Sequence, residues 1–237
     1  MSDMLLTVQN LDAWYGRAQV LFDLKLEVGR GEVVALMGRN GAGKSTTMKA
    51  VMGLLKRKRG SVQFMGQDIL GLEPFRIARL GLGFVPENRR IFTDLTVVEN
   101  LEVGRQPPRP GIPEWTHERL FKLFPNLGEM PGRMGGSMSG GEQQMLTVSR
   151  TLMGNPYLVL LDEPSEGVAP VIVEQMVGMM LELKEKGMSI LLSEQNLHFA
   201  ELVSDRAYVL EKGQIRFEGS MEKLAANEQV RKAYLEV

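Results

Sequence analysis

The residues with the clearest chemical meaning form a glycine-rich segment, Gly38 to Ser45, which fits the pattern G-x-x-x-x-G-K-S/T. Glycines let the backbone curl so that its N–H groups face a phosphate, and the start of a following helix adds partial positive charge. We expect Lys44 to neutralise β- and γ-phosphate oxygens and the Ser45 hydroxyl to hold Mg²⁺. The residues expected to contact the phosphates are Gly38, Asn40, Gly41, Ala42, Gly43, Lys44, Ser45 and Thr46.

A pair of acids, Asp162 and Glu163, follows the apolar run at residues 158–161. Open α/β sheets bind ligands at the carboxyl ends of their strands, which is where this pair would lie. We expect Asp162 to hold Mg²⁺ through its water shell and Glu163 to polarise the attacking water. An acidic turn after a strand is common by itself, so this interpretation depends on the phosphate-binding segment elsewhere in the chain.

A second glycine motif, Ser139-Gly140-Gly141, opens a segment with helical periodicity. A hydroxyl and bare backbone N–H groups at a helix N-terminus suit a second anion. One chain cannot easily bring this motif and Gly38–Ser45 to the same phosphate, whereas two chains packed head to tail can. The motif therefore indicates a paired assembly.

The elements that must position these residues alternate between strands and helices. Continuous apolar runs at 33–37 and 158–161 are typical of strands buried on both faces, and they indicate an α/β fold with a mainly parallel sheet. Further strands are expected at 24–28, 61–64, 82–85, 189–192, 206–211 and 214–218, the last two as a hairpin. Helices are expected at 44–52, 97–103, 117–123, 141–153, 170–186, after Asn196 and from Met221 onward. The turn-rich, helical stretch between about Asn88 and Pro156 is interpreted as an insertion.

Composition excludes several classes of protein. The chain has 237 residues, of which 43% are hydrophobic and 24% charged, as in a globular protein of one or two domains. A net charge of −1 argues against a dedicated nucleic-acid binder, and the absence of cysteine excludes disulfides and thiol chemistry. No apolar run approaches the ~20 residues that span a bilayer, and Met1 to Met4 show no secretory signal. We therefore expect a soluble, cytoplasmic protein.

The phosphate-binding segment, the Ser-Gly-Gly-Glu-Gln segment at 139–143 and Leu-Leu-Asp-Glu-Pro at 160–164 together resemble the ATP-binding subunits of ABC transporters. The resemblance covers essentially the whole chain. It implies a P-loop NTPase (RecA-like) core with a mainly parallel sheet, an N-terminal antiparallel β subdomain and a helical insertion subdomain. As one domain over 1–237, residues 1–87 and 157–237 would form the nucleotide-binding core and 88–156 the helical subdomain.

The resemblance also implies roles for residues and partners. ATP would lie between the phosphate-binding segment of one subunit and Ser139-Gly140-Gly141 of a second, identical or different subunit. Tyr15 would stack on adenine, with Trp14 as the competing candidate and an ordinary edge-strand aromatic as the other interpretation. Two transmembrane permeases and, indirectly, a periplasmic binding protein would complete the transporter. Residues 87–100 would border the groove that receives a short cytoplasmic helix of a permease.

Three segments are similar to the subgroup that imports branched-chain and other hydrophobic amino acids: Val85–Phe92, Pro164–Pro170 and Ser193–Asn196. Two positions differ from the commonest pattern of the broad family. Glu87 stands where Gln is usual, and it can still reach Mg²⁺ or the attacking water. Gln195 stands where His is usual; its amide can donate to the γ-phosphate but cannot ionise near neutral pH. His198 is interpreted as a surface or packing residue rather than a substitute.

The resemblance thus predicts an ATP- and Mg²⁺-dependent motor subunit on the inner face of the cell membrane. Urea and short-amide importers have similar subunits. The sequence is also compatible with a non-transport ATPase of the same family or with a nucleotide-binding regulatory subunit. The basic run Lys56-Arg57-Lys58-Arg59 is interpreted as a solvated helix end and turn rather than a lipid or nucleic-acid site.

Overall fold

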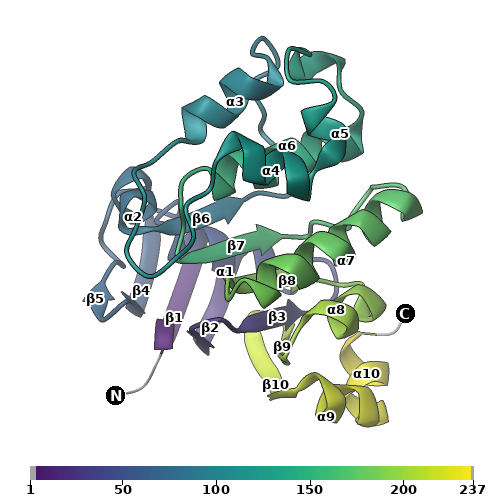
Figure 1. Cartoon of the computed structure of the whole chain (residues 1–237). Helices are drawn as coiled ribbons and strands as arrows, with labels where there is room; N and C mark the ends of the chain where they lie inside the picture. Colours follow the sequence, from purple (N-terminus) through teal and green to yellow (C-terminus); the bar gives the residue numbers. More distant parts are fainter. Residues whose placement is uncertain (1–3, 236–237) are drawn as a thin grey trace.

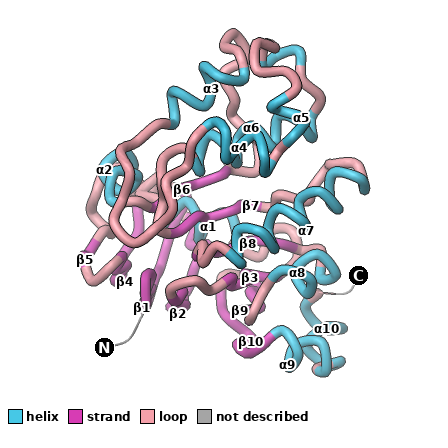
Figure 2. The backbone as a smooth tube through the Cα atoms, viewed as in Figure 1, coloured by secondary structure: helices cyan, strands magenta, loops and turns pink. Residues whose placement is uncertain are grey.

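The protein, seen in a computed structural model that describes residues 4–235, is built around two β-sheets (Figures 1 and 2). Residues 1–3 and 236–237 lie outside the described part, and with them most of the segment on which the expectation of no secretory signal rests. Among the helices of residues 4–235, none combines the length and the apolarity needed to cross a bilayer.

The larger sheet has six strands in the order β10-β9-β3-β8-β7-β6. From β9 to β6 every neighbouring pair is parallel, and β10 closes one edge as an antiparallel hairpin with β9, so the predicted mainly parallel sheet is confirmed. Its strands are β3 (Val33–Met37), β6 (Leu82–Val85), β7 (Leu158–Asp162), β8 (Ser189–Glu194), β9 (Arg206–Glu211) and β10 (Gln214–Ser220).

The smaller sheet is antiparallel and has the order β2-β1-β4-β5, as the resemblance implies for the N-terminal part. Its strands are β1 (Met4–Tyr15), β2 (Ala18–Gly29), β4 (Arg57–Phe64) and β5 (Gln67–Asp68). The long strands β1 and β2 form a hairpin whose turn follows Tyr15 directly.

The helices form layers on both sides of the larger sheet (Figure 1). Helix α1 (Lys44–Val51) packs between the two sheets, and α6 (Gly140–Leu152), α7 (Pro170–Glu185) and α8 (Leu197–Val203) pack on the opposite face. Helices α9 (Met221–Ala226) and α10 (Glu228–Tyr234) lie beside β9 and β10. The remaining helical elements are α2 (Pro74–Leu80), α3 (Val97–Gly104), α4 (His117–Leu123), α5 (Pro125–Gly128) and the 3₁₀ turn η1 (Gly135–Ser137).

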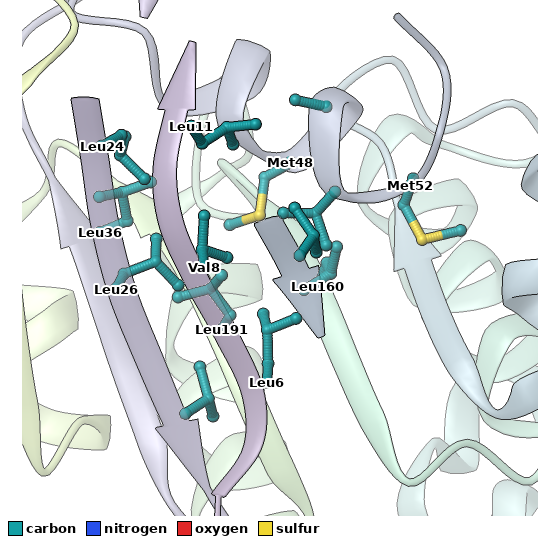
Figure 3. Close-up of a cluster of buried hydrophobic side chains, with 14 of the residues drawn as sticks. Leu6, Val8, Leu11, Leu24, Leu26, Leu36, Met48, Met52, Leu160 and Leu191 are labelled. Atoms are coloured by element: carbon teal, nitrogen blue, oxygen red, sulfur yellow. The ribbon is translucent and has the colours of Figure 1, made fainter. Parts of the chain in front are cut away.

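Strand β7 shows why its sequence is apolar throughout. Leu158 and Leu160 join the core between the sheets, whereas Val159 and Leu161 join the core beneath α6 and α7. Figure 3 shows Leu160 within the first of these cores, facing side chains of β1 and α1. Each such buried side chain contributes about 1.5–3 kcal/mol, so burial on both faces fixes the strand that carries Asp162.

The strands and helices expected from the sequence are confirmed, with ends shifted by a few residues and with β2 and β4 longer than expected. Strands β1 and β5, helices α2 and α5, and the turn η1 lie outside those expectations. The interpretation of the basic run 56–59 as a helix end and turn is wrong. Helix α1 ends at Val51, and Arg57 to Arg59 belong to β4, where pairing with β1 holds them extended.

Candidate nucleotide-binding site

The phosphate loop, residues 38–45, connects the carboxyl end of β3 to α1. Gly41 and Gly43 have φ angles of +80° and +114°, which favour glycine. A Cβ on Gly43 would lie 2.9 Å from Leu21 Cδ2, and one on Gly38 would collide with the Leu210 carbonyl. The loop therefore packs closely against β2 and β9, and its shape requires glycine.

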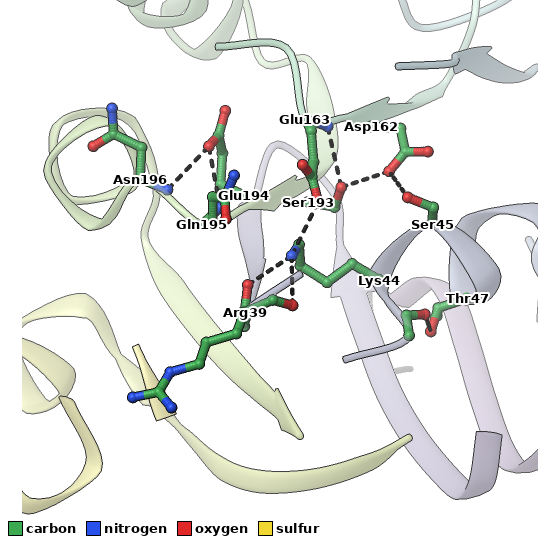
Figure 4. Close-up of polar contacts among 12 residues, drawn as sticks. Arg39, Lys44, Ser45, Thr47, Asp162, Glu163, Ser193, Glu194, Gln195 and Asn196 are labelled. Atoms are coloured by element: carbon green, nitrogen blue, oxygen red, sulfur yellow. Dashed lines mark hydrogen bonds and ion pairs between the residues drawn. The ribbon is translucent and has the colours of Figure 1, made fainter. Parts of the chain in front are cut away.

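Lys44 is held at the centre of this loop and is 3% exposed. Its ammonium donates to the carbonyls of Gly38 (2.6 Å) and Arg39 (3.1 Å), and it lies 3.0 Å from Glu163 Oε1 (Figure 4). The positive charge thus lies between the phosphate loop and the acid that follows β7.

Asp162 ends β7 and is almost fully buried. Its Oδ1 accepts hydrogen bonds from Ser45 Oγ (2.9 Å) and Ser193 Oγ (2.7 Å), while Oδ2 is buried without a hydrogen-bond partner. Burial raises the pKa of Asp162 above its ordinary value, and the hydrogen bonds from Ser193 and Ser45 oppose that rise. A buried carboxylate oxygen that lacks a donor, beside a serine hydroxyl, is a fit for a hard cation such as Mg²⁺.

No cluster of three or more His, Cys, Asp or Glu side chains within residues 4–235 has the geometry to hold a metal ion by itself. Mg²⁺ usually keeps several waters and takes one or two protein ligands together with substrate phosphates. Ser45 and Asp162 match that kind of site, in which the phosphates supply ligands of their own.

Glu163 has a φ of +47° and is 7% exposed. Its N–H donates to Ser193 Oγ and Ser193 O, at 3.1 and 3.0 Å, so the adjacent strand β8 holds this unusual backbone. Burial acts to raise the pKa of Glu163, but hydrogen bonds with Glu166 and Lys44 and the charge of Lys44 lower it on balance. Glu163 is therefore ionised, as a general base must be.

Glu166 shares a hydrogen bond with Glu163. That bond, together with burial and the negative charges of Glu163 and Glu87, raises the pKa of Glu166 to about 7. Between two acids this close, the proton stays on Glu166 and the charge on Glu163. Glu87 follows β6 and is exposed. Since its negative charge acts on Glu166, Glu87 lies near that residue at the rim of the site.

Glu194 ends β8 and is 1% exposed. Its carboxylate accepts from the backbone N–H groups of Ser165 (3.0 Å) and of Gln195 and Asn196 (both 3.2 Å), and burial raises its pKa. These bonds connect the turn after β7 to the turn after β8. Gln195 is left exposed beside the acids, and His198 lies exposed on α8, as expected for a surface residue.

Ser139 caps α6 and lies apart from the phosphate loop of its own chain. Its hydroxyl accepts from the Glu142 N–H while Glu142 accepts from the Ser139 N–H, a capping box that fixes the helix start. A Cβ on Gly140 would lie 2.7 Å from Arg89 Nη1, so a guanidinium covers this glycine. Within residues 4–235, no hydrogen bond or ion pair connects residues 139–141 to residues 38–45.

Tyr15 and Trp14 end β1 next to the β1–β2 turn. Tyr15 is 48% exposed, which leaves its ring accessible. The Trp14 ring is covered instead by Arg57 and Arg59, whose guanidinium carbons lie 4.9 and 5.8 Å from its centroid. Of the two candidates for stacking on a base, Tyr15 has the open ring.

Sequence reasoning missed three residues of the site: Ser193, Glu166 and Glu194. Ser193 lies opposite Asp162 in the parallel register of β7 and β8, so only the strand pairing reveals that it holds both acids. A polar residue at the end of an otherwise apolar strand is the signal that the sequence offers for Ser193 and Glu194.

A glycine-rich loop, a buried lysine and paired acids at the carboxyl ends of neighbouring parallel strands define a nucleoside-triphosphate-binding protein of the phosphate-loop class. The sequence profile of the ABC transporter family matches residues 21–166. The chain therefore belongs to the ATP-binding subunits of the ABC transporter family, which bind ATP and hydrolyse it.

Two relatives cover nearly the whole chain. The high-affinity branched-chain amino acid transport ATP-binding protein BraG of Pseudomonas aeruginosa is 41% identical and covers 98% of this chain and 99% of its own. The lipopolysaccharide export system ATP-binding protein LptB of Haemophilus influenzae is 34% identical, covering 98% and 97%. A solved ATP-binding cassette of an ABC transporter in its ADP conformation has a TM-score of 0.80 and 30% identity, covering 97% of each chain.

Proposed function

We propose that this chain is the ATP-hydrolysing motor subunit of an importer of branched-chain or other hydrophobic amino acids. The observation that carries the catalytic part is the ionised Glu163, fixed by Ser193 and 3.0 Å from the phosphate-loop lysine. The 41% identity with BraG over almost the full chain supports the amino-acid part. Residues 88–156 would form the helical subdomain of this single domain.

In this proposal Lys44 and the N–H groups of the phosphate loop bind the β- and γ-phosphates. Ser45 and Asp162 would hold Mg²⁺, and the chemistry that this ion supplies when bound is positive charge to offset that of the phosphates. Glu163 accepts the proton of the attacking water, and Gln195 and Glu87 border the position of the γ-phosphate. The buried Lys44 and Asp162 exclude bulk water from one side of the site.

The second half of the site would come from another subunit. Ser139, Gly140 and Gly141 present a hydroxyl and backbone N–H groups, and within residues 4–235 no hydrogen bond or ion pair ties them to the phosphate loop of the same chain. Two subunits, identical or different, packed head to tail would place this motif against the γ-phosphate bound to the partner. Tyr15 would stack on the adenine.

A groove suited to a membrane partner lies between α2 and the segment after β6. Its volume is about 560 Å³, and its lining includes the exposed Leu54, Phe75, Phe92 and Val103. Arg150 also lines it, and Nη1 of this residue is buried without a hydrogen-bond partner. We propose that a short cytoplasmic helix of a permease occupies the groove, which would hold the subunit at the inner membrane face. A periplasmic binding protein would deliver the solute.

The test is solute uptake by the organism that carries the gene, after deletion and complementation. Loss of labelled leucine uptake, restored by the wild-type chain but not by Glu163→Gln, is the expected result. Retained leucine uptake with loss of urea uptake would assign the subunit to an amide importer. A defect in lipopolysaccharide export, the process named for the relative LptB, would assign it to an exporter. Normal uptake of both solutes together with normal export would favour a non-transport or regulatory ATPase.

A further inference from the structure

The basic run 56–59 lies beside the expected adenine site instead of on an isolated turn. In the pairing of β1 with β4, Trp14 lies opposite Arg57 and Asp12 lies opposite Arg59. Because side chains alternate along a strand, Arg57 and Arg59 share one face of β4, and Lys58 points to the other. Lys58 donates to the Leu55 carbonyl at 2.8 Å.

Both arginines on this face stack on Trp14. The guanidinium carbon of Arg57 lies 4.9 Å from the centroid of the Trp14 ring and that of Arg59 lies 5.8 Å from it, within cation–π range. Arg59 is anchored by Asp12, to which its Nε donates at 2.7 Å. Asp12 is mostly buried, and its carboxylate also accepts a hydrogen bond from Gln19. The carboxylate that holds Arg59 against Trp14 is therefore itself fixed in place.

Arg57 has a second contact, with the turn that follows Tyr15. Its Nη1 donates to the Gly16 carbonyl at 3.2 Å. Gly16 has a φ of +59° and is the residue through which β1 turns toward β2. A single guanidinium therefore stacks on the ring before Tyr15 and holds the peptide after it.

We propose that Arg57 is a positioning residue for the nucleotide base: it covers Trp14 and holds the β1–β2 turn so that Tyr15 presents its open ring to adenine. The inference rests on the proposed function in one respect, the stacking of Tyr15 on the base. Without Arg57 the turn samples more conformations, and the bound conformation is then only a fraction of the population, which weakens apparent affinity. The phosphate loop and Glu163 are unaffected, so hydrolysis of bound ATP continues.

The kinetic test uses the full-length chain with its permease partners. We expect Arg57→Ala to raise the KM for ATP by about three- to tenfold, the size of one cation–π contact plus one exposed hydrogen bond. The kcat should stay within about twofold. Arg57→Lys keeps a cation and a donor and should recover most of the affinity. Lys56→Ala is the matched control, because it removes the same charge one residue away and its ammonium has no hydrogen bond or ion pair within residues 4–235.

A double-mutant cycle separates positioning from a general structural effect. If Arg57 acts through Tyr15, the Tyr15→Ala/Arg57→Ala protein should bind ATP no more weakly than Tyr15→Ala alone. Additive losses would overturn the inference. If Tyr15→Ala itself leaves KM unchanged, the adenine assignment in the proposed function fails. If Tyr15→Ala raises KM and Arg57→Ala does not, only the role of Arg57 fails.

Trp14 supplies a spectroscopic readout. The chain has two tryptophans, so Trp115→Phe leaves Trp14 as the only fluorescent indole. Trp115 is 3% exposed and its indole N–H has no hydrogen-bond partner, so this substitution keeps an aromatic ring in the core and breaks no hydrogen bond of the indole. In that background Arg57→Ala should increase quenching by acrylamide, and Lys56→Ala should not. Equal quenching in the Arg57→Ala and parent proteins would show that Arg57 does not cover Trp14 in solution, which would overturn the inference.

Discussion

Lys44 and Glu163 form a buried ion pair in which Nζ lies 3.0 Å from Oε1, with side chains that are 2% and 7% exposed. A buried charge is costly without a partner. Burial acts to raise the pKa of Glu163, but its hydrogen bonds with Glu166 and Lys44 and the positive charge of Lys44 lower that pKa on balance. ATP phosphates would compete with Glu163 for the same ammonium. We therefore expect nucleotide binding to separate Glu163 from Lys44. Glu163 would then be free to accept a proton from water only when the phosphate loop is occupied.

The first prediction is that Glu163→Gln lowers ATP turnover by about 10²–10⁴-fold, because a neutral amide cannot accept the proton of water. Lys44 loses its competing partner, so ATP affinity should stay equal or increase. Turnover and nucleotide binding are measured on the same preparation. Glu166→Gln, which removes the neighbouring carboxyl, is the control and should retain most turnover. Turnover of Glu163→Gln within about tenfold of wild type would contradict the assignment of the base.

The second prediction concerns Ser193, which is fully buried between the two acids. Ser193→Ala removes the hydroxyl that donates to Asp162 at 2.7 Å and accepts from the Glu163 N–H at 3.1 Å. We expect a loss of about 1–3 kcal/mol in the free energy of unfolding and a higher Mg²⁺ concentration for half-maximal ATPase activity.

Ser189→Ala is the matched control for this prediction. Ser189 begins the same strand and is also buried, but its hydroxyl accepts from the Gly31 N–H, far from the acids. It should lose comparable stability without a change in Mg²⁺ dependence. An equal shift in Mg²⁺ dependence for both variants would show that Ser193 acts only through stability.

The parts of the site that lie on one short segment were predictable, and the parts that depend on strand pairing were not. Residues 38–45 form a contiguous pattern, and the apolar run before Asp162 identifies its strand by itself. Ser193 shows locally only that a polar residue ends an apolar strand, and its role comes from lying opposite Asp162 in the sheet. The stacking of Arg57 and Arg59 on Trp14 likewise depends on the register of β1 with β4, which the sequence does not show.

Elements with weak periodicity were also missed for physical reasons. Strand β1 contains register shifts around Asn10, whose φ of +50° interrupts the alternation expected of a strand. Helix α2 spans seven residues, buries Ile77 alone and ends at the left-handed Gly81, so its apolar face is too small to predict. The basic run followed a helix in the sequence, but cross-strand pairing with β1 decided its conformation.

The third prediction follows from Glu166, whose pKa is raised to about 7 by its hydrogen bond with Glu163, by burial and by nearby negative charge. Since the folded protein binds this proton more tightly than the unfolded chain, the stabilisation is complete below about pH 4.5 and is lost as the pH rises through about 7. The melting temperature of nucleotide-free wild type, relative to Glu166→Gln, should therefore fall across this range. Glu174→Gln, at an exposed position of α7, is the control for loss of charge. A difference that does not change with pH would show that Glu166 and Glu163 do not share a proton.

The last prediction concerns Gln195, whose backbone is fixed by Glu194 and whose exposed amide makes no hydrogen bond within residues 4–235. If it donates to the γ-phosphate, Gln195→Ala should lower kcat by about three- to tenfold with a smaller change in ATP affinity. Gln195→Glu should be worse, because it places a carboxylate against a phosphate.

Gln195→His gives the sharper test of the same prediction. It should retain activity and add a dependence on pH around 6–7, where an imidazole titrates and an amide does not. ATPase rates are measured against pH with and without the permease partners. His198→Ala is the control, since that imidazole lies exposed on α8 and should affect neither kcat nor the pH profile. If Gln195→Ala hydrolyses ATP like wild type in the assembled transporter, Gln195 does not contact the γ-phosphate, and Glu163 with Lys44 must orient that phosphate without the residue that follows β8.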